Sequence, residues 1–217
     1  MKKNIGIYLI RHGRQSSRLC NVNVPLDEAG IRQSELLGKR VQNMNIGAVY
    51  SSDLTRAVET ASIVNQYTKV SHHIYTELRE IDFGDLTGLE DSVIKEKYAD
   101  FLKERDKYEK DIPFPGGENG KQLFARAFAA IEDIVDKAVK NDIENVLVVT
   151  HGGTIRSLLA GVIGLPQEKR LLFAKCFENT SITRLNYNTE SQRYYIEQIN
   201  DYSHLENEEW LLRKNLK

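Results

Sequence analysis

The chain has 217 residues, of which 41% are hydrophobic and 28% are charged, so it can bury a sizeable core and is not expected to be disordered. Its 30 basic and 31 acidic side chains leave a formal charge of −1. This balance gives no reason to expect nucleic acid or a membrane as a partner, so any attraction for an anion must be local.

The cysteines and the N-terminal residues bear on the cellular compartment. Cys20 and Cys176 are too few for a disulfide framework and predict reduced thiols in the cytosol. Lys2 and Lys3 precede an apolar run, but that run, residues 5–10, is too short for a signal peptide. No stretch approaches the ~20 apolar residues of a membrane span. We therefore expect a cytoplasmic protein.

Predicted strands and helices alternate along the chain. Short apolar runs predict strands, at residues 4–10, 46–50, 70–75 and 146–149. Capping residues and apolar positions at helical spacing predict helices, beginning near Asp27, Asp53, Leu123 and Thr154. Two more strands around a polar turn predict a hairpin, at 181–186 and 193–199, and a short helix is expected after Glu206. This alternation predicts an α/β fold with a mainly parallel sheet. With no repeat or linker in the sequence, we expect one domain over residues 1–217.

The stretch from 91 to 111 differs from the rest of the chain. It is rich in Lys, Glu, Asp and Tyr, and Pro113 and Pro115 follow it. Its charge pattern favours a solvated helix. The alternative is a lid inserted over a site, which would occupy about 85–118.

Two histidines directly follow predicted strands. Arg11 and His12 come after the first strand, and His151 comes after the strand at 146–149. Ligands of open α/β sheets bind outside the carboxyl ends of the strands, so both histidines can face one crevice if the two strands are neighbours. Each is followed by glycine, which would let the backbone approach a ligand closely. One histidine at a strand end is usually structural, but two at matching positions favour function.

Two further side chains suit the same crevice. Arg56 lies near the start of the second predicted helix, where a guanidinium can bind phosphate oxygens in a bidentate fork. The alternative is a surface ion pair with Glu59 or Glu35. Glu80 follows the third predicted strand and could be a general acid or an ordinary loop glutamate.

Competing motifs are incomplete. Residues 116–121 superficially resemble a phosphate-binding P-loop, but Pro115 and Gln122 replace its first glycine and its Ser or Thr. A zinc site needs about three protein ligands, and His12 and His151 lack an accompanying H-x-x-x-H or C-x-x-C pair. The sequence also lacks the G-x-S-x-G elbow of many serine hydrolases.

Read together, four segments resemble the histidine phosphatase superfamily, also called the phosphoglycerate mutase-like family. They are residues 9–13, 51–61, 78–84 and 148–153, which occur in the family's order. The resemblance extends from residue 5 to about residue 181. It implies a three-layer α/β/α fold with a mainly parallel central sheet.

The resemblance also implies a role for each matching residue. His12 would be the catalytic nucleophile that becomes phosphohistidine, and Glu80 would protonate the leaving oxygen. Arg11, Arg56 and His151 would bind the phosphoryl oxygens, with His151 also part of the catalytic group. Two arginines and a histidine can stabilise the transferring group without a metal, so we expect neither a metal nor a cofactor.

The loop after His12 departs from the family pattern. Arg14 and Arg18 lie there, and relatives often have an acidic residue at the first of these positions. Added positive charge beside a phosphate pocket would favour substrates with a second anionic group. Alternatively, both arginines point into solvent or pair with Asp27 and Glu28.

A second candidate for substrate specificity lies late in the chain. Asn179 and Thr180 resemble a segment near the family's pocket. The resemblance implies only that these two residues are candidates for a role in substrate specificity.

The leading prediction is a metal-independent phosphomonoester hydrolase that acts on a small phosphorylated metabolite through phosphohistidine on His12. One alternative is a cofactor-dependent phosphoglycerate mutase, which shares the first half-reaction. Another is a non-catalytic protein that binds a phosphorylated ligand, although the intact catalytic set counts against it. We expect no nucleic acid or membrane partner. The oligomeric state stays open, with a homodimer as one option.

Overall fold

The apolar runs of the sequence form a central sheet in the computed structural model, which describes residues 4–213. The sheet has six strands in the order β3-β2-β4-β1-β5-β6. Their bounds are β1 Asn4–Arg11, β2 Ile46–Ser51, β3 Ser71–Ile74, β4 Asn145–Thr150, β5 Ile182–Asn188 and β6 Arg193–Asp201. The first four strands are parallel, β5 is antiparallel to β1, and β6 is antiparallel to β5. The predicted mainly parallel sheet is confirmed.

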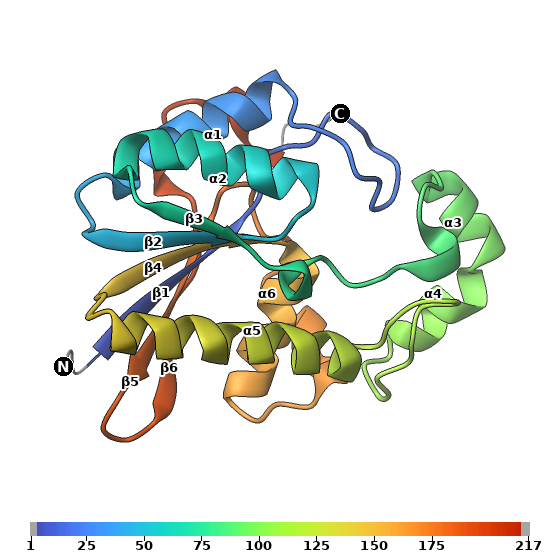
Figure 1. Cartoon of the computed structure of the whole chain (residues 1–217). Coiled ribbons are helices and arrows are strands. Elements are labelled where there is room, and N and C mark those ends of the chain that lie inside the picture. Colours follow the sequence, from blue (N-terminus) through green and yellow to red (C-terminus); the bar gives the residue numbers. More distant parts are fainter. Residues whose placement is uncertain (1–3, 214–217) are drawn as a thin grey trace.

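Helices cover both faces of the sheet, which gives three layers (Figure 1). Helices α1 (Glu28–Val41) and α2 (Thr55–Thr68) lie on one face, and α5 (Gly120–Lys140) and α6 (Gly152–Val162) lie on the other. Asp27 caps α1 as predicted, because its carboxylate accepts the N–H of Gly30 at 2.7 Å. The buried strands are apolar on both faces because helices cover both.

The charged stretch forms two short helices rather than one. Helices α3 (Asp91–Lys97) and α4 (Ala99–Arg105) project beyond the edge of the sheet (Figure 1). They share a small apolar cluster with Ile81, Phe114 and Leu123, so the segment is not a solvated helix alone. Its function as a lid stays a prediction.

The last part of the chain returns to α1. The helix predicted after Glu206 is a single 3-10 turn, Glu209–Leu211. Leu205 and Leu211 pack against Ala29 of α1 in a small cluster of their own. This packing holds the C-terminal segment near the loops at the carboxyl ends of the strands. Within residues 4–213, no helix is long and apolar enough to cross a membrane.

Candidate active site

The sheet order brings the two strand-end histidines together. Strands β1 and β4 pair in parallel with Arg11 opposite Thr150, so the residues that follow each strand leave the same edge of the sheet. The rings of His12 and His151 have centroids 5.0 Å apart. The shared crevice expected from the sequence therefore forms, although 138 residues separate these histidines in the chain.

The His12 imidazole is arranged to be neutral, with its proton on Nδ1 and none on Nε2. Its Nδ1 lies 2.7 Å from the carbonyl oxygen of Gly13, which can only accept, so Nδ1 carries the proton. Nε2 accepts the Nε–H of Arg56 at 3.2 Å. Burial, with the charges of Arg56 and Arg11, holds the pKa of His12 well below its ordinary 6.5. Such an imidazole is a nucleophile at neutral pH.

Arg56 is a buried residue of the site and forms no surface ion pair with Glu59 or Glu35. Its side chain is 2% exposed, and besides His12 it contacts the loop that follows the nucleophile. The guanidinium donates to the carbonyl of Val22 and to the side chain of Asn21, both at 2.9 Å. Arg56 therefore joins this loop to the nucleophile.

Arg11 and His151 each hold a buried polar atom that has no partner among the described residues, Nε and Nδ1 respectively. His151 Nε2 lies 2.7 Å from the hydroxyl of Ser52, while another Arg11 nitrogen donates to the carbonyl of Phe177. Burial, with the nearby charge of Arg213, lowers the pKa of Arg11 to about 10, so it stays protonated at neutral pH. A buried polar atom without a partner is costly unless a ligand supplies the missing hydrogen bond.

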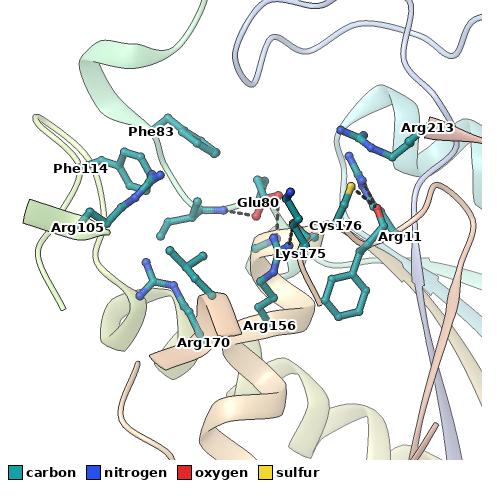
Figure 2. Close-up of a pocket in the computed structure, with 15 residues that line it drawn as sticks. Arg11, Glu80, Phe83, Arg105, Phe114, Arg156, Arg170, Lys175, Cys176 and Arg213 are labelled. Carbon is teal, nitrogen blue, oxygen red and sulfur yellow. Dashed lines mark hydrogen bonds between the residues drawn. The ribbon is translucent and has the colours of Figure 1, made fainter. Parts of the chain in front are cut away.

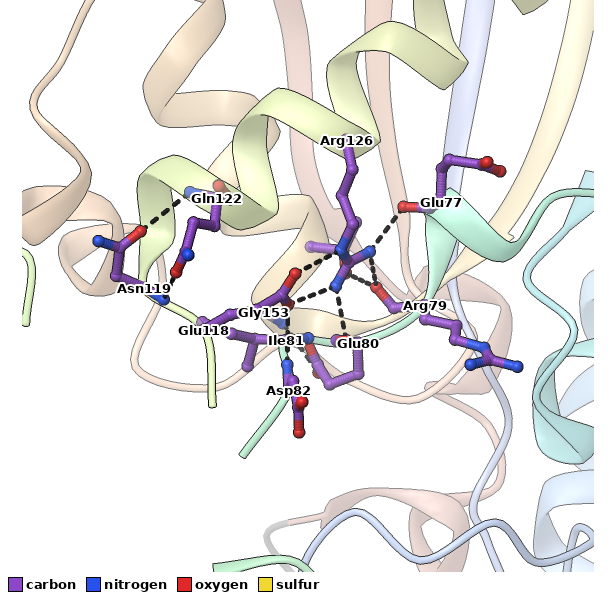
Figure 3. Close-up of polar contacts among 12 residues, drawn as sticks. Glu77, Arg79, Glu80, Ile81, Asp82, Glu118, Asn119, Gln122, Arg126 and Gly153 are labelled. Carbon is purple, nitrogen blue, oxygen red and sulfur yellow. Dashed lines mark hydrogen bonds and ion pairs between the residues drawn. The ribbon is translucent and has the colours of Figure 1, made fainter. Parts of the chain in front are cut away.

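Glu80 is held in place from two sides. Its carboxylate accepts the backbone N–H groups of Ile81 at 2.9 Å and Gly153 at 3.1 Å. Arg126 of α5 donates to the backbone carbonyl of Glu80 at 2.8 Å and binds the Glu118 carboxylate at 2.7 Å (Figure 3). The loop that carries Glu80 is therefore fixed to α5, and its carboxyl group lines the crevice beside Arg11.

The glycines near the two histidines differ in the space around them. A Cβ on Gly13 would lie 2.7 Å from the carbonyl oxygen of Gly30, so this glycine lets α1 approach β1. A Cβ on Gly153 would lie 2.3 Å from a Glu80 carboxylate oxygen. Both distances are too short for real contacts. Gly13 and Gly153 therefore make room for the protein's own backbone and for the catalytic carboxyl candidate. Gly152, which directly follows His151, differs from them, because the nearest atom to a Cβ there would lie 3.8 Å away. Its expected approach to a ligand stays a prediction.

The two arginines of the loop after His12, Arg14 and Arg18, both lie at the site, and Arg14 also forms an ion pair. Arg14 pairs with Asp27 at 2.8 Å, as the second alternative proposed, and this pairing offsets its charge. Arg14 and Arg18 both line a cavity of about 750 Å³ that also contains His12. Their contribution to substrate choice stays a prediction.

Asn179 and Thr180 lie in different surroundings. The side-chain amide of Asn179 donates to the carbonyl of His12 at 2.8 Å, and Asn179 lines the same large cavity. The Thr180 hydroxyl lies 3.1 Å from His204 and outside that cavity. The fold brings Asn179, but not Thr180, to the nucleophile.

A second cavity of about 320 Å³ adjoins the first (Figure 2). Some of the residues that line it had not been predicted from the sequence. Arg11, Glu80 and Arg213 belong to the walls of both cavities. Arg213 comes from the C-terminal segment, and Arg156 comes from α6. No motif marks these arginines or Arg126, because each is one charged residue in an otherwise ordinary helix or tail. Within residues 4–213, no group of three or more His, Cys, Asp or Glu side chains could hold a metal ion.

Comparisons with known proteins show the family of the chain. A family model described as the histidine phosphatase superfamily (branch 1) matches residues 7–201. The probable phosphoglycerate mutase GpmB of Proteus mirabilis (strain HI4320) is 30% identical over 209 residues, which cover 92% of this chain and 94% of that protein. The protein of the same name in Yersinia pestis (strain Pestoides F) is 29% identical over 210 residues, with the same coverage.

Solved structures of other proteins have a similar fold. The mycobacterial glucosyl-3-phosphoglycerate phosphatase in complex with inorganic phosphate has a TM-score of 0.80 and 26% identity, covering 94% of this chain and 99% of that chain. Bacillus stearothermophilus YhfR has a TM-score of 0.80 and 27% identity, covering 93% of this chain and 100% of that chain.

Proposed function

Because the chain belongs to the histidine phosphatase superfamily (branch 1), it is an enzyme of the histidine phosphatase type, and we propose that it hydrolyses small phosphomonoesters through a phosphohistidine on His12. The observation that carries this proposal is the neutral His12, with Nε2 directed at Arg56 and the unpartnered buried nitrogens of Arg11 and His151 nearby. A phosphoryl oxygen would accept the Arg11 Nε–H, and it would also accept from His151 Nδ1 in the tautomer that carries the ring proton there.

The geometry supports a reaction in two steps. His12 Nε2 attacks phosphorus, the bond from phosphorus to the leaving oxygen breaks, and Glu80 gives its proton to that oxygen. The Glu80 carboxylate then takes a proton from water, whose oxygen attacks phosphorus while the bond to Nε2 breaks. Arg11 and Arg56 offset the charge spread over the phosphoryl oxygens in both steps.

Hydrolysis and mutase activity share the first step and differ in the acceptor. Relatives named probable phosphoglycerate mutase support the mutase alternative, whereas a solved structure of similar fold named as a phosphatase supports hydrolysis. We favour hydrolysis because the loop after His12 departs from the mutases, which must orient two phosphates. The loop from His12 to Pro25 is several residues shorter than in mutases, and Asn23 takes the place of a frequent aspartate. The intact set of His12, Arg11, Arg56, Glu80 and His151 argues against a non-catalytic binding protein.

The expected result is steady release of inorganic phosphate from p-nitrophenyl phosphate, with no loss of rate in EDTA, because arginines supply the positive charge at the site. A parallel assay would follow the interconversion of 3- and 2-phosphoglycerate with and without 2,3-bisphosphoglycerate. Interconversion that depends on the bisphosphate, with little net phosphate release, would contradict the proposal and favour the mutase.

The lowered pKa of His12 predicts how the rate depends on pH. Only neutral His12 is nucleophilic, so the rate falls as the pH drops through its pKa. Since that pKa lies well below 6.5 in the free enzyme, kcat/KM should keep most of its value at pH 6 and decline at lower pH. The phosphate of the substrate also titrates at low pH. Measuring kcat/KM on two substrates with different phosphate pKa values separates the decline caused by the enzyme from the decline caused by the substrate. An enzyme decline centred at or above pH 6.5 would contradict the prediction.

A further inference from the structure

The smaller cavity beside Glu80 is strongly positive, although the chain as a whole is almost neutral. Five arginines and one lysine line it, and Glu80 is the one acidic side chain among the described lining residues. Figure 2 shows Arg156 next to Glu80, with Arg105 and Arg170 on one side and Arg213 on the other. The formal charge of the chain is −1, so this concentration of cations is local.

Part of this charge is not offset by carboxylates. Arg170 is paired with the buried Asp111 at 2.8 Å. In contrast, Arg156 donates to the backbone carbonyls of residues 173 and 174 at 3.1 and 3.0 Å, which position the guanidinium without neutralising it. None of the ion pairs formed between described residues includes Arg156, Lys175 or Arg213. Burial lowers the pKa of Arg156, while the nearby charge of Glu80 acts in the opposite direction without forming an ion pair with it.

The cavity also has apolar walls that suit the body of an organic molecule. Ile81, Phe83, Phe114 and Leu171 contribute to its lining. Its volume of about 320 Å³ is at the lower end of the ~300–1,000 Å³ typical of small-molecule sites. Apolar walls with a few convergent charges are typical of a site that binds an organic anion.

Its position identifies which part of the substrate would enter. His12 lines the larger cavity but not the smaller one, whereas Glu80 lines both. In an in-line transfer the leaving oxygen lies opposite His12, and Glu80 must reach it to donate a proton. A group attached to the leaving oxygen can therefore extend past Glu80 into the smaller cavity, towards Arg156.

We propose that this cavity binds the leaving group and selects phosphomonoesters whose alcohol carries a second anionic group, with Arg156 and Lys175 as its partners. The inference rests on the proposed hydrolysis. It also moves the second-anion contact away from Arg14, which the loop sequence had suggested and which Asp27 already neutralises in part.

A matched pair of substrates tests the proposal. 4-Carboxyphenyl phosphate and 4-carbamoylphenyl phosphate have the same size, but only the first carries a second anion. The wild type should favour the carboxylate in kcat/KM. Arg156→Gln should lower the ratio of the two kcat/KM values about ten- to a hundredfold, as expected for the loss of a charge-assisted contact. The two phenols also differ in how easily they leave. Dividing the kcat/KM ratio of each variant by the kcat/KM ratio of the wild type removes this difference.

Two further variants keep the test decisive. Lys175 is exposed, so Lys175→Gln leaves the fold intact, and it should lower the same ratio even if Arg156→Gln folds poorly. Arg193→Gln removes the same charge from the exposed surface of β6, far from both cavities, and should leave the ratio unchanged. A fall in the ratio with Arg14→Gln and not with Arg156→Gln or Lys175→Gln would overturn the proposal.

The outcomes separate the two proposals. If neither Arg156→Gln nor Lys175→Gln changes the ratio, the subsite proposal is wrong and the proposed hydrolysis stands. If the folded wild type releases phosphate from neither of these substrates nor from p-nitrophenyl phosphate, the proposed hydrolysis fails and the subsite inference fails with it.

Discussion

Replacing His12 with Ala should reduce turnover by on the order of 10³- to 10⁶-fold, because the variant has no nucleophile to form the covalent intermediate. His12 is 5% exposed and makes contact with Gly13 and Arg56, so circular dichroism and thermal unfolding must first show that the variant folds. His12→Gln, which fills more of the space, serves as a second variant if the alanine variant is unstable.

Labelling gives this prediction a second readout. Brief incubation with phosphorylated substrate and rapid denaturation should leave an acid-labile, base-stable phosphoryl group on the wild type and none on the variant. His73→Ala is the matched control, since His73 is exposed on β3 and stacks on Tyr50 outside the crevice. Label that persists without His12 would refute the proposed nucleophile.

The second large effect is expected at Glu80. Glu80→Gln keeps the size of the side chain and removes its acid, so esters with poor leaving groups should lose about 10²- to 10⁴-fold in kcat/KM. p-Nitrophenyl phosphate should lose much less, because its leaving group needs little protonation. The difference between the two substrates is the diagnostic quantity, since a mere loss of folded protein would lower both equally.

Asp82 provides the matched control for Glu80. It lies two residues further along the same loop, is exposed, and accepts the N–H of Gly84 at 2.9 Å instead of lining either cavity. Asp82→Asn should therefore change both substrates little. If Glu80→Gln affects the two substrates equally while Asp82→Asn affects the poor leaving group selectively, the acid is Asp82.

Local sequence was sufficient to predict the strands of the sheet, the helices that cover it and the first residues of the site. The continuous apolar run of β1 predicted a strand buried on both faces, and Asp27 predicted the start of α1. His12, His151, Arg56 and the loop of Glu80 follow strands or begin a helix, so the carboxyl edge of a parallel sheet could be inferred to collect them. Prediction was poorer for residues 91–111, because charge patterning does not reveal the small apolar cluster formed with Phe114.

Other features of the site arise only when distant segments pack together. The pairing of β1 with β4 sets the 5.0 Å separation of the two histidine rings, and no local pattern specifies that pairing. Arg156 on α6 and Arg213 in the C-terminal segment line one cavity with Glu80, far from both in sequence. The role of Gly153 likewise depends on where the Glu80 carboxylate lies. Strand and helix formation depends on neighbours along the chain, whereas cavity walls and charge balance depend on side chains that meet through long-range packing.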